Sequence, residues 1–392
     1  MSTKKVFIIF IVIFLLGFFV RLYNLGSNPA GFFADEAATG LHAYSLLTTG
    51  RDYNGVPFPF FFESFGFYRN PLSVYFAIPS VAIFGLNEFG VRLTTAIFGA
   101  ATTITTALLV LKLKIFSIRN YNLIFAAIAS LFIAFSPWHI HFSRFASENI
   151  LFPFFLTLSL LLFYLGLQNK KFLPISFLSF GISIYSYFPA WLTIPLLVIF
   201  IVGVYFKELI RVKKEFIMGV VLFMLLLFPL LIGIFNGPVL SRWNMVKTKT
   251  DSAEPTVIKT SKAYIAHFSP DFLFLKGDID YPGHFITRYG SRGAGQMYLY
   301  QLPLLVIGII YLLMKLRISK EVLILIIILL VYPLGGSLAN SDGGGAISWR
   351  SIIGTIPLNI TSAIGLILII SAFTKFLKNF FPLTIIFIAI SF

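Results

Sequence analysis

Long apolar runs are the feature that most constrains this 392-residue chain, because charged residues hardly interrupt them. Several runs approach the roughly 20 residues that a helix needs to cross a bilayer core. The chain is 58% hydrophobic and 11% charged, whereas soluble domains carry about 25% charged residues. The runs are continuous and do not alternate as the strands of a barrel do. The sequence therefore predicts an all-α polytopic membrane protein.

Positive charge between the runs predicts their orientation, because cytoplasmic loops are rich in Lys and Arg. Lys4 and Lys5 precede the first run, so we expect a cytoplasmic N-terminus. Alternating sides from there makes every predicted cytoplasmic loop basic. We expect about eleven spans, the last one apparently truncated, beginning near Val6, Arg92, Tyr121, Asn149, Phe172, Ala190, Phe216, Leu302, Glu321, Ile352 and Asn379.

The apolar run at residues 71–86 is the exception, because counting it as a crossing would invert every later loop. It is short and contains Pro79, so we expect a helix that lies in the outer interface. The chain is then one membrane domain, residues 1–392, with two large outside segments. These are residues 21–91 and residues 237–301.

The acidic pair Asp35-Glu36 is the first candidate site, since it stands just beyond the first run of a chain that avoids charge. Acids in the first turn of a helix complement the helix dipole, and residues 36–47 are predicted to form a short helix that ends near Thr49-Gly50. Alternatively, one carboxylate is a general base, alone or beside a metal ion, at the boundary between water and lipid.

The stretch SPWHIHFSRFASE, residues 136–148, is the second candidate site, at the outer end of the third predicted span. Arg144 and Glu148 are four residues apart, so on one helix they share a face and could pair. Charges at the entrance of a membrane segment are costly unless they are paired or used, which favours a functional role. His139 and His141 alternate, which suits a metal site in an extended segment or, alternatively, a solvated interfacial pair.

Two further arginines are candidate phosphate ligands. Arg69 precedes Asn70-Pro71 at the start of the predicted interfacial helix, and Arg350 stands in the outside loop SDGGGAISWRS. Arginine binds phosphate through parallel hydrogen bonds, but each residue could also anchor a helix end at lipid headgroups. The triple glycine of that loop lacks the Lys-Ser or Lys-Thr of a nucleotide-binding loop, so we expect only a turn there.

Composition excludes some functions and leaves others open. The net charge of +15 does not indicate nucleic acid, because the basic residues cluster in short loops between apolar runs. The chain has no cysteine, which excludes disulfides and thiolate metal sites. A transporter or flippase remains an alternative, although its charges would lie inside the spans and no inverted repeat is visible. A structural membrane subunit would leave the outside acids unexplained.

An ordered series of short motifs gives the chain a resemblance to a known family. The motifs are Asp35-Glu36 with Gly40 and residues 43–47, Arg69 to Leu72, Val91 to Leu93, SPWHIHFSRFASE, Tyr185 to Pro189, Phe272 to Phe274, Gly277-Asp278, Gly290, and finally Arg350 with Pro357. In this order they resemble the lipid-carrier-dependent glycosyltransferases of the GT-C superfamily, above all the protein O-mannosyltransferase and aminoarabinose transferase branch. Relatives often have a histidine where this chain has residues 346–348, and many have Lys or His in place of Arg69.

The resemblance implies a GT-C-like helical bundle with interfacial helices in the first outside loop and one large second outside loop. It implies inverting transfer of a sugar from a polyprenyl-phosphate donor to an acceptor hydroxyl, at the outer face of the plasma membrane and among membrane lipids. A divalent metal ion is allowed, whereas no nucleotide or redox cofactor is expected, and the sugar and the acceptor (protein, lipid or glycan) stay open. The implied residues are Asp35, Glu36 and Glu148 for catalysis; Arg69, Arg144 and Arg350 for the donor phosphate; Tyr187, His139 and Asp278 for the substrate pocket; and Asp35 and Glu148 for a metal.

Overall fold

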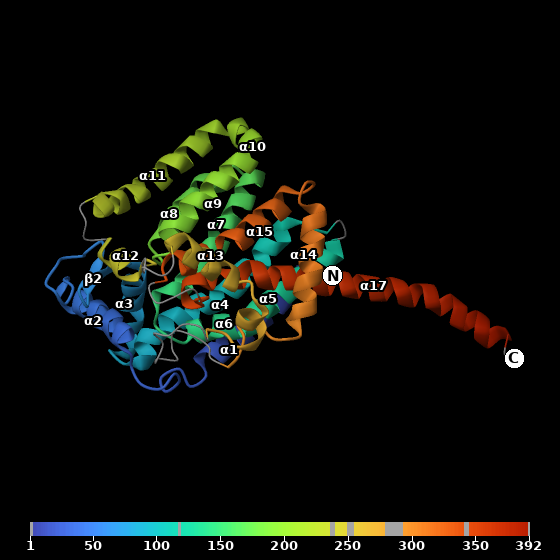
Figure 1. Ribbon diagram of the computed structural model, residues 1–392, viewed down its shortest axis with the longest axis horizontal. Coiled ribbons are helices and arrows are strands. Elements are labelled where there is room, and N and C mark those ends of the chain that lie inside the picture. The colour runs from blue at the N-terminus through green and yellow to red at the C-terminus, as the bar shows by residue number, and fades with distance from the viewer. Residues whose placement is uncertain are drawn as a thin grey trace.

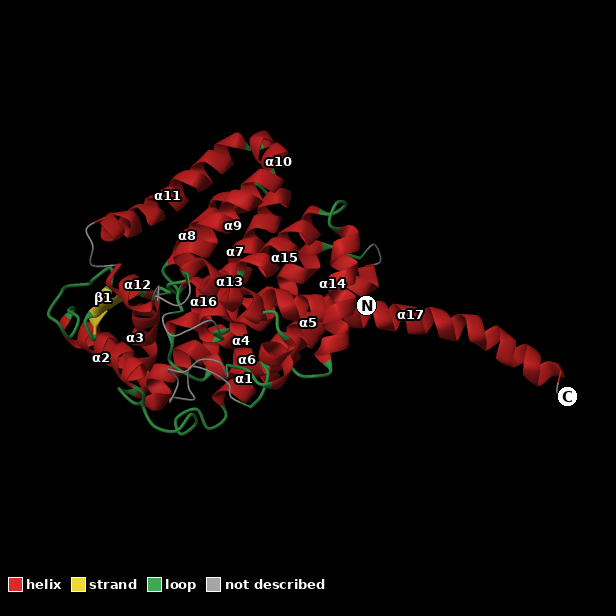
Figure 2. Ribbon diagram, viewed as in Figure 1, coloured by secondary structure: helices red, strands yellow, loops and turns green. Residues whose placement is uncertain are grey.

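The fold consists almost entirely of helices, as the apolar runs predicted (Figures 1 and 2). The computed structural model describes residues 3–116, 119–235, 240–248, 255–278, 293–340 and 345–390. In these ranges the helices are α1 (Thr3–Leu22), α2 (Ala34–Thr49), α3 (Leu72–Phe84), α4 (Glu88–Leu113), α5 (Arg119–Phe135), α6 (Pro137–Ser143), α7 (Leu151–Gln168), α8 (Phe172–Ile184), α9 (Ala190–Val204), α10 (Phe206–Arg211), α11 (Lys213–Phe235), α12 (Leu240–Val246), α13 (Thr256–Ala266), α14 (Gln301–Lys315), α15 (Lys320–Val331), α16 (Leu334–Leu338) and α17 (Thr355–Ile390). Shorter turns complete them: the 3₁₀ helices Glu148–Ile150 and Trp349–Gly354, and the π-helical turn Asp271–Leu275.

Several of these helices are suited to a membrane, and the chain is therefore a multi-pass membrane protein. Five segments within the described ranges are long and apolar enough to cross a bilayer: Glu88–Leu113, Glu148–Gln168, Lys213–Phe235, Lys320–Leu338 and Trp349–Phe376. The bent pair α5 and α6 makes a sixth if it counts as one span. Five more apolar helices, α3 among them, have between 10 and 17 residues. The number of about eleven spans and their orientation stay predictions.

The C-terminal region differs from its prediction. The sequence predicted two spans, beginning near Ile352 and Asn379, with a basic loop between them. The structure has one continuous helix there, α17, which projects away from the rest of the molecule (Figure 1). Neither Gly nor Pro occurs in residues 366–381, so nothing in the local sequence ends the helix.

The break between α5 and α6 has an identifiable local cause. Pro137 begins α6, and the residue before a proline avoids the helical conformation; accordingly Ser136 is extended, and the two helices meet at 55°. A break leaves carbonyls at the end of α5 without their helical partners. The fully buried Arg21 of α1 donates to two of these, Ile133 O and Ala134 O, and so holds three helices together.

Small residues let α14 and α17 approach backbone to backbone. A Cβ added at Gly308 would come within 2.0 Å of Thr361 O, and one at Gly365 within 1.9 Å of Leu304 O. Membrane helices without a hydrophobic drive to associate commonly pack in this way. The pair forms one side of the bundle, while α7, α8 and α9 run side by side on the other (Figure 1).

The predicted first outside segment, residues 21–91, lies at one end of the bundle with α2, α3 and the only strands of the described chain (Figure 2). Strands β1 (Phe62–Ser64) and β2 (Phe67–Arg69) form an antiparallel hairpin in which Phe62 faces Arg69. The helix predicted after the acidic pair is confirmed as α2, and Gly50 ends it in the left-handed conformation, with φ of 68°. Such a cap favours glycine because glycine has no Cβ.

Candidate active site

A small polar cavity of about 40 Å³ brings together four of the residues predicted for a site. The polar members come from four separate parts of the chain: the start of α2, the end of β2, the 3₁₀ turn before α7, and the turn before α9. The lining residues are Asp35, Phe67, Tyr68, Arg69, Asn70, Ser147, Glu148, Tyr187, Phe188 and Trp349. Asp35, Arg69, Glu148 and Tyr187 are therefore neighbours in space, as the resemblance implied.

Asp35 and Arg69 form the charged pair of this cavity. Arg69 Nη1 lies 3.7 Å from Asp35 Oδ1 and donates a hydrogen bond of 3.0 Å to Asp35 O. The Arg69 side chain is 8% exposed and that of Asp35 is 23% exposed. The guanidinium is thus fixed by the backbone of α2, while the carboxylate keeps access to the cavity.

Glu148 also lines the cavity and is held by Asn70, the residue that follows Arg69. Asn70 N donates to Glu148 Oε2 at 3.2 Å, and Asn70 Nδ2 lies 3.5 Å from Glu148 Oε1. Trp191 Nε1 in turn donates to Asn70 Oδ1 at 3.0 Å, which fixes the orientation of the amide. Sequence reasoning missed Asn70 as a site residue, although it stands inside the Arg-Asn-Pro-Leu motif.

Glu36, although adjacent to Asp35 in the sequence, lies in a different environment. It is fully buried, and Arg92 donates to both of its oxygens, at 2.6 Å and 3.0 Å. Its carboxylate also accepts from Phe33 N and from Ala146 N. Glu36 therefore links the segment that carries Asp35 to the segment that carries Glu148.

Arg92 completes this link and was not predicted as a site residue. It is fully buried and, besides Glu36, it donates to Leu25 O, Pro29 O and Gly31 O of the loop before α2. A buried ion pair is stable only when its remaining hydrogen-bonding groups are also satisfied. Here the backbone carbonyls of an irregular loop supply the acceptors, so the ion pair also shapes that loop.

Arg350 does not itself line the cavity, but its neighbour in sequence, Trp349, does. The side chain is 8% exposed, and its guanidinium carbon lies 5.4 Å from the centre of the Trp349 ring. Within the described residues its Nη1 has no hydrogen-bond partner. A buried donor of this kind is costly unless an acceptor reaches it.

The loop before Arg350 is held by His267 and Asp278, two side chains from the predicted second outside segment. Both are fully or almost fully buried. Asp278 accepts from Ser348 N at 2.7 Å and from Ser348 Oγ at 2.5 Å. His267 Nε2 accepts from Ile347 N at 3.1 Å, while its Nδ1 bonds to Ala263 O. Burial lowers the pKa of His267 to about 4, so the ring is neutral and can accept this hydrogen bond.

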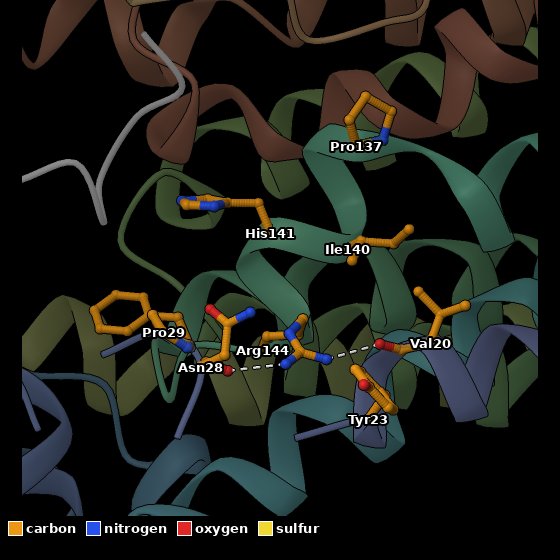
Figure 3. Close-up of a pocket in the computed structure, with 9 residues that line it drawn as sticks. Val20, Tyr23, Asn28, Pro29, Pro137, Ile140, His141 and Arg144 are labelled. Atoms are coloured by element: carbon orange, nitrogen blue, oxygen red, sulfur yellow. Dashed lines mark hydrogen bonds between the residues drawn. The ribbon is translucent and has the colours of Figure 1, made fainter. Parts of the chain in front are cut away.

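Five predicted residues do not line the polar cavity: Glu36, Arg350 and Asp278, described above, and Arg144 and His139. Arg144 lines a separate cavity of about 420 Å³ and donates to the carbonyls of Val20 and Asn28, at 2.7 Å and 2.9 Å (Figure 3). His139 is fully buried in α6, where Arg21 Nη2 approaches its Nδ1 at 2.9 Å. The expectation that Arg144 and Glu148 share a helix face is wrong, because α6 ends at Ser143 and the next helical turn begins at Glu148.

The described residues contain no group of three or more His, Cys, Asp or Glu side chains that could hold a metal ion. Asp35 and Glu148 do line the same cavity. Mg²⁺ is commonly held by one or two carboxylates together with substrate phosphates and water. The donor set of this cavity therefore fits a divalent ion only when a phosphate completes it.

A second, apolar cavity adjoins the polar one, and Phe188 lines both. Its volume is about 390 Å³. Aliphatic and aromatic side chains from α9, α12 and α16 form its walls: Phe188, Pro189, Trp191, Leu192, Leu240, Trp243, Leu334, Gly335, Leu338 and Ala339. A polar pocket with charged residues thus opens beside a space suited to a hydrocarbon chain.

The sequence is similar to one protein family and to one further protein. Residues 69–232 match the family described as dolichyl-phosphate-mannose-protein mannosyltransferase. An uncharacterized protein of Aquifex aeolicus (strain VF5) is 30% identical over 219 residues, which are 54% of this chain and 39% of that protein. The chain thus spans well under half the length of this relative.

Two solved structures share the architecture. ArnT from Cupriavidus metallidurans, bound to undecaprenyl phosphate, superposes with a TM-score of 0.60 at 13% identity, covering 93% of this chain and 60% of that one. The archaeal oligosaccharyltransferase AglB from Archaeoglobus fulgidus, in complex with an inhibitory peptide and a dolichol-phosphate, gives 0.55 at 14% identity, covering 96% and 52%. The chain therefore has the same overall fold as these two proteins, as its resemblance to the GT-C superfamily implied.

Proposed function

We propose that the protein is an inverting glycosyltransferase that moves a sugar from a polyprenyl-phosphate donor to an acceptor hydroxyl at the outer face of the membrane. One observation carries the proposal: a polar cavity with Asp35, Arg69 and Glu148 adjoins an apolar cavity through Phe188. A donor of this class has a charged head on a hydrocarbon chain, which needs these two environments side by side. The neighbours bound to undecaprenyl phosphate and dolichol-phosphate support the same class of donor.

Asp35 is the proposed general base. Inversion requires the acceptor oxygen to attack the anomeric carbon from the face opposite the phosphate, while a base takes the hydroxyl proton. Asp35 is the carboxylate that reaches the cavity from the N-terminal turn of α2. The bond from the anomeric carbon to the phosphate oxygen then breaks, and the polyprenyl phosphate leaves as an anion.

Arg69 and Arg350 are the proposed partners of that anion. Cations placed where charge develops stabilise the transition state more than they stabilise the substrate. The buried Nη1 of Arg350 would gain an acceptor, and Arg69 already lies at the cavity with its position fixed by Asp35 O. A divalent ion held by Asp35, Glu148 and the phosphate would contribute further neutralisation of this charge.

The apolar cavity is the proposed place of the first isoprene units. Its walls are almost free of polar side chains, and two tryptophans, Trp191 and Trp243, line it. Trp191 also orients Asn70, which holds Glu148. Filling the apolar cavity would therefore act directly on the position of a carboxylate in the polar one.

Transfer with purified protein tests the proposal, using a panel of polyprenyl-phosphate sugars and a mixture of candidate acceptors. We expect sugar release from at least one donor with inversion at the anomeric carbon, and no turnover by Asp35→Asn. Phe188→Asp, which places a charge between the two cavities, should weaken binding of polyprenyl phosphate. Binding of the lipid phosphate without any transfer across the panel, together with unchanged binding by Phe188→Asp, would contradict the proposal.

A further inference from the structure

Three phenylalanines on the first outside segment expose their rings: Phe58, Phe60 and Phe65, which we call the aromatic tip. They are 68%, 48% and 60% exposed. Large apolar residues exposed together mark a contact with a partner or a membrane. The hairpin β1–β2 carries Phe65 at its turn, and Phe58 and Phe60 lie in the bent segment that leads into it.

Two of these residues have a backbone conformation that is energetically unfavourable for a bulky side chain. Phe65 and Gly66 form the two-residue turn of the hairpin with φ of 55° and 76°. Both angles are positive, as in a type I′ hairpin turn, and in that turn Asn-Gly is the preferred sequence. Phe58 also has a positive φ, of 40°. Bulky side chains rarely adopt this conformation unless the surroundings or a function require it.

The position of the hairpin identifies the surface that the tip meets. Strand β2 packs against α12, the helix that follows α11 in the chain. Helix α11 is long and apolar enough to cross a bilayer, only 17% of its most apolar window is buried, and Phe235 at its end is 85% exposed, so we expect this helix to face lipid along most of its length. The hairpin and α12 lie together at this end of α11 (Figure 1). The tip is therefore at the level where a lipid-facing span leaves the membrane.

The base of the tip connects it to the apolar cavity. The Phe60 ring packs edge-on against Tyr185, at 4.9 Å between centroids, and Phe61 packs against Trp191 at 6.1 Å. Trp191 lines the apolar cavity. The exposed Arg51 forms a backbone β-bridge with Pro57, the residue before Phe58, and its Nη1 donates to Gly55 O, so a cation lies in the segment that leads to the tip. Aromatic rings flanked by a cation are typical of the headgroup region of a bilayer.

We propose that the aromatic tip inserts into the lipid leaflet at the site's side of the membrane and anchors the hairpin at the boundary of headgroups and acyl chains. Strand β2 ends at Arg69, which lies 3.7 Å from Asp35. The anchor thus fixes the depth of the charged pair relative to the lipids. The partner is the lipid surface itself and not a second protein.

Spin labels test the insertion, because the native chain has no cysteine. Single cysteines replace Phe58, Phe60 and Phe65 in the full chain, reconstituted into bilayers of zwitterionic and anionic phospholipid. Collision with oxygen and with a water-soluble nickel complex is measured for each label. Glu63→Cys and Asn54→Cys, exposed residues of the same segment, are the controls. We expect oxygen to dominate at the three tip positions and nickel to dominate at both controls.

A nickel-dominated signal at all three tip positions would overturn the proposal, because the rings would then face water or another protein. Phe65→Asn provides a second test that does not depend on labels. Asn suits the turn better than Phe, so in detergent this variant should be as stable as the native chain or more stable. In bilayers, labels at position 58 should then become more accessible to nickel. A variant that is less stable in detergent and leaves position 58 unchanged contradicts the anchor.

Discussion

At the scale of single residues, Asp35 and Glu36 are adjacent in sequence but occupy different environments. Successive residues of a helix point about 100° apart. Asp35 therefore reaches the cavity, while Glu36 points inward to Arg92. We expect Asp35→Asn to fold normally and to lose about 10²–10⁴ in kcat, the usual effect of removing a general base. Steady-state kinetics and a thermal unfolding curve measure the two properties.

Glu36→Gln should show the opposite pattern. Breaking a buried ion pair by removing one partner costs about 3–5 kcal/mol, because the other charge stays buried. We therefore expect a marked drop in thermal stability for Glu36→Gln, and a similar drop for Arg92→Met. A stable Glu36→Gln enzyme without activity would instead place Glu36 in the reaction.

Glu148→Gln separates a supporting carboxylate from a catalytic one. Gln keeps an acceptor for Asn70 N but carries no charge. We expect a smaller loss of kcat than for Asp35→Asn, and a stronger dependence of the rate on added Mg²⁺ if Glu148 and Asp35 share a metal ion. A loss equal to that of Asp35→Asn would make Glu148 an equal partner in the chemistry.

The proposed contact of Arg350 with the donor phosphate is tested by comparing the variants Arg350→Lys and Arg350→Ala. Lysine keeps the charge but not the planar fork that binds phosphate through two hydrogen bonds. We expect both variants to bind polyprenyl phosphate more weakly, with Arg350→Ala affected more, and kcat should fall as well as KM for the donor rise, because the guanidinium is proposed to act on the charge of the transition state. Arg317, on the predicted cytoplasmic side, serves as the matched control. Unchanged donor binding by Arg350→Ala would reduce this residue to a support for Trp349.

At the scale of elements, the second outside segment fixes the loop that carries Arg350. Asp278→Asn keeps one acceptor for Ser348 N but cannot accept from both Ser348 N and Ser348 Oγ. A hydrogen bond to a charged group contributes about 1.5–3 kcal/mol, so donor affinity should fall by about ten- to a hundredfold if the loop is released. Asp271→Asn, an exposed residue of the same segment paired with Lys276, is the control and should bind normally. Equal effects in the two variants would contradict a specific hold on the loop.

The sequence predicts most of what local patterns determine. Apolar periodicity and the basic loops predict the helical membrane fold, and the acidic first turn with Thr49-Gly50 predicts α2. The ordered motifs identified Asp35, Arg69, Glu148 and Tyr187 as candidates, and these four residues line one cavity. Residue spacing predicts side-chain contacts only within a regular helix. Arg144 and Glu148 are four residues apart, but they do not share a helix face because α6 ends at Ser143.

Partners far apart in the chain could not be predicted from the residues themselves. Arg92 is 56 residues from Glu36, and its other acceptors are carbonyls of an irregular loop, which no side-chain pattern reveals. Asp278 was expected in the substrate pocket, yet it accepts from Ser348 and acts on Arg350 only through that loop. In both cases a side chain binds backbone groups of a distant segment, and a sequence pattern does not reveal which backbone groups will lie near that side chain.

At the scale of the whole molecule, the orientation of every loop depends on whether α3 crosses the membrane. Its 13 residues are about 20 Å long at 1.5 Å per residue, against a hydrocarbon core of about 30 Å. Helix α3 also packs along α2 and α4 instead of standing apart from them. We therefore expect residues on both sides of α3 to face the same compartment. A crossing would place Arg69 and Asn87 on opposite sides and invert all later basic loops.

Labelling with a membrane-impermeant thiol reagent on intact cells measures this directly. Glu63→Cys precedes α3, and Asn87→Cys follows it; both positions are exposed. Because Asn87 caps α4 by accepting from Gly90 N, Leu86→Cys repeats the measurement without removing the cap. Lys171→Cys, in the predicted cytoplasmic loop between α7 and α8, is the control that should react only after the membrane is opened. Reaction of positions 63, 86 and 87 from outside supports the topology. Protection of positions 86 and 87 until the membrane is opened, together with reaction of position 171 on intact cells, would show that α3 crosses and that the later half of the chain is inverted.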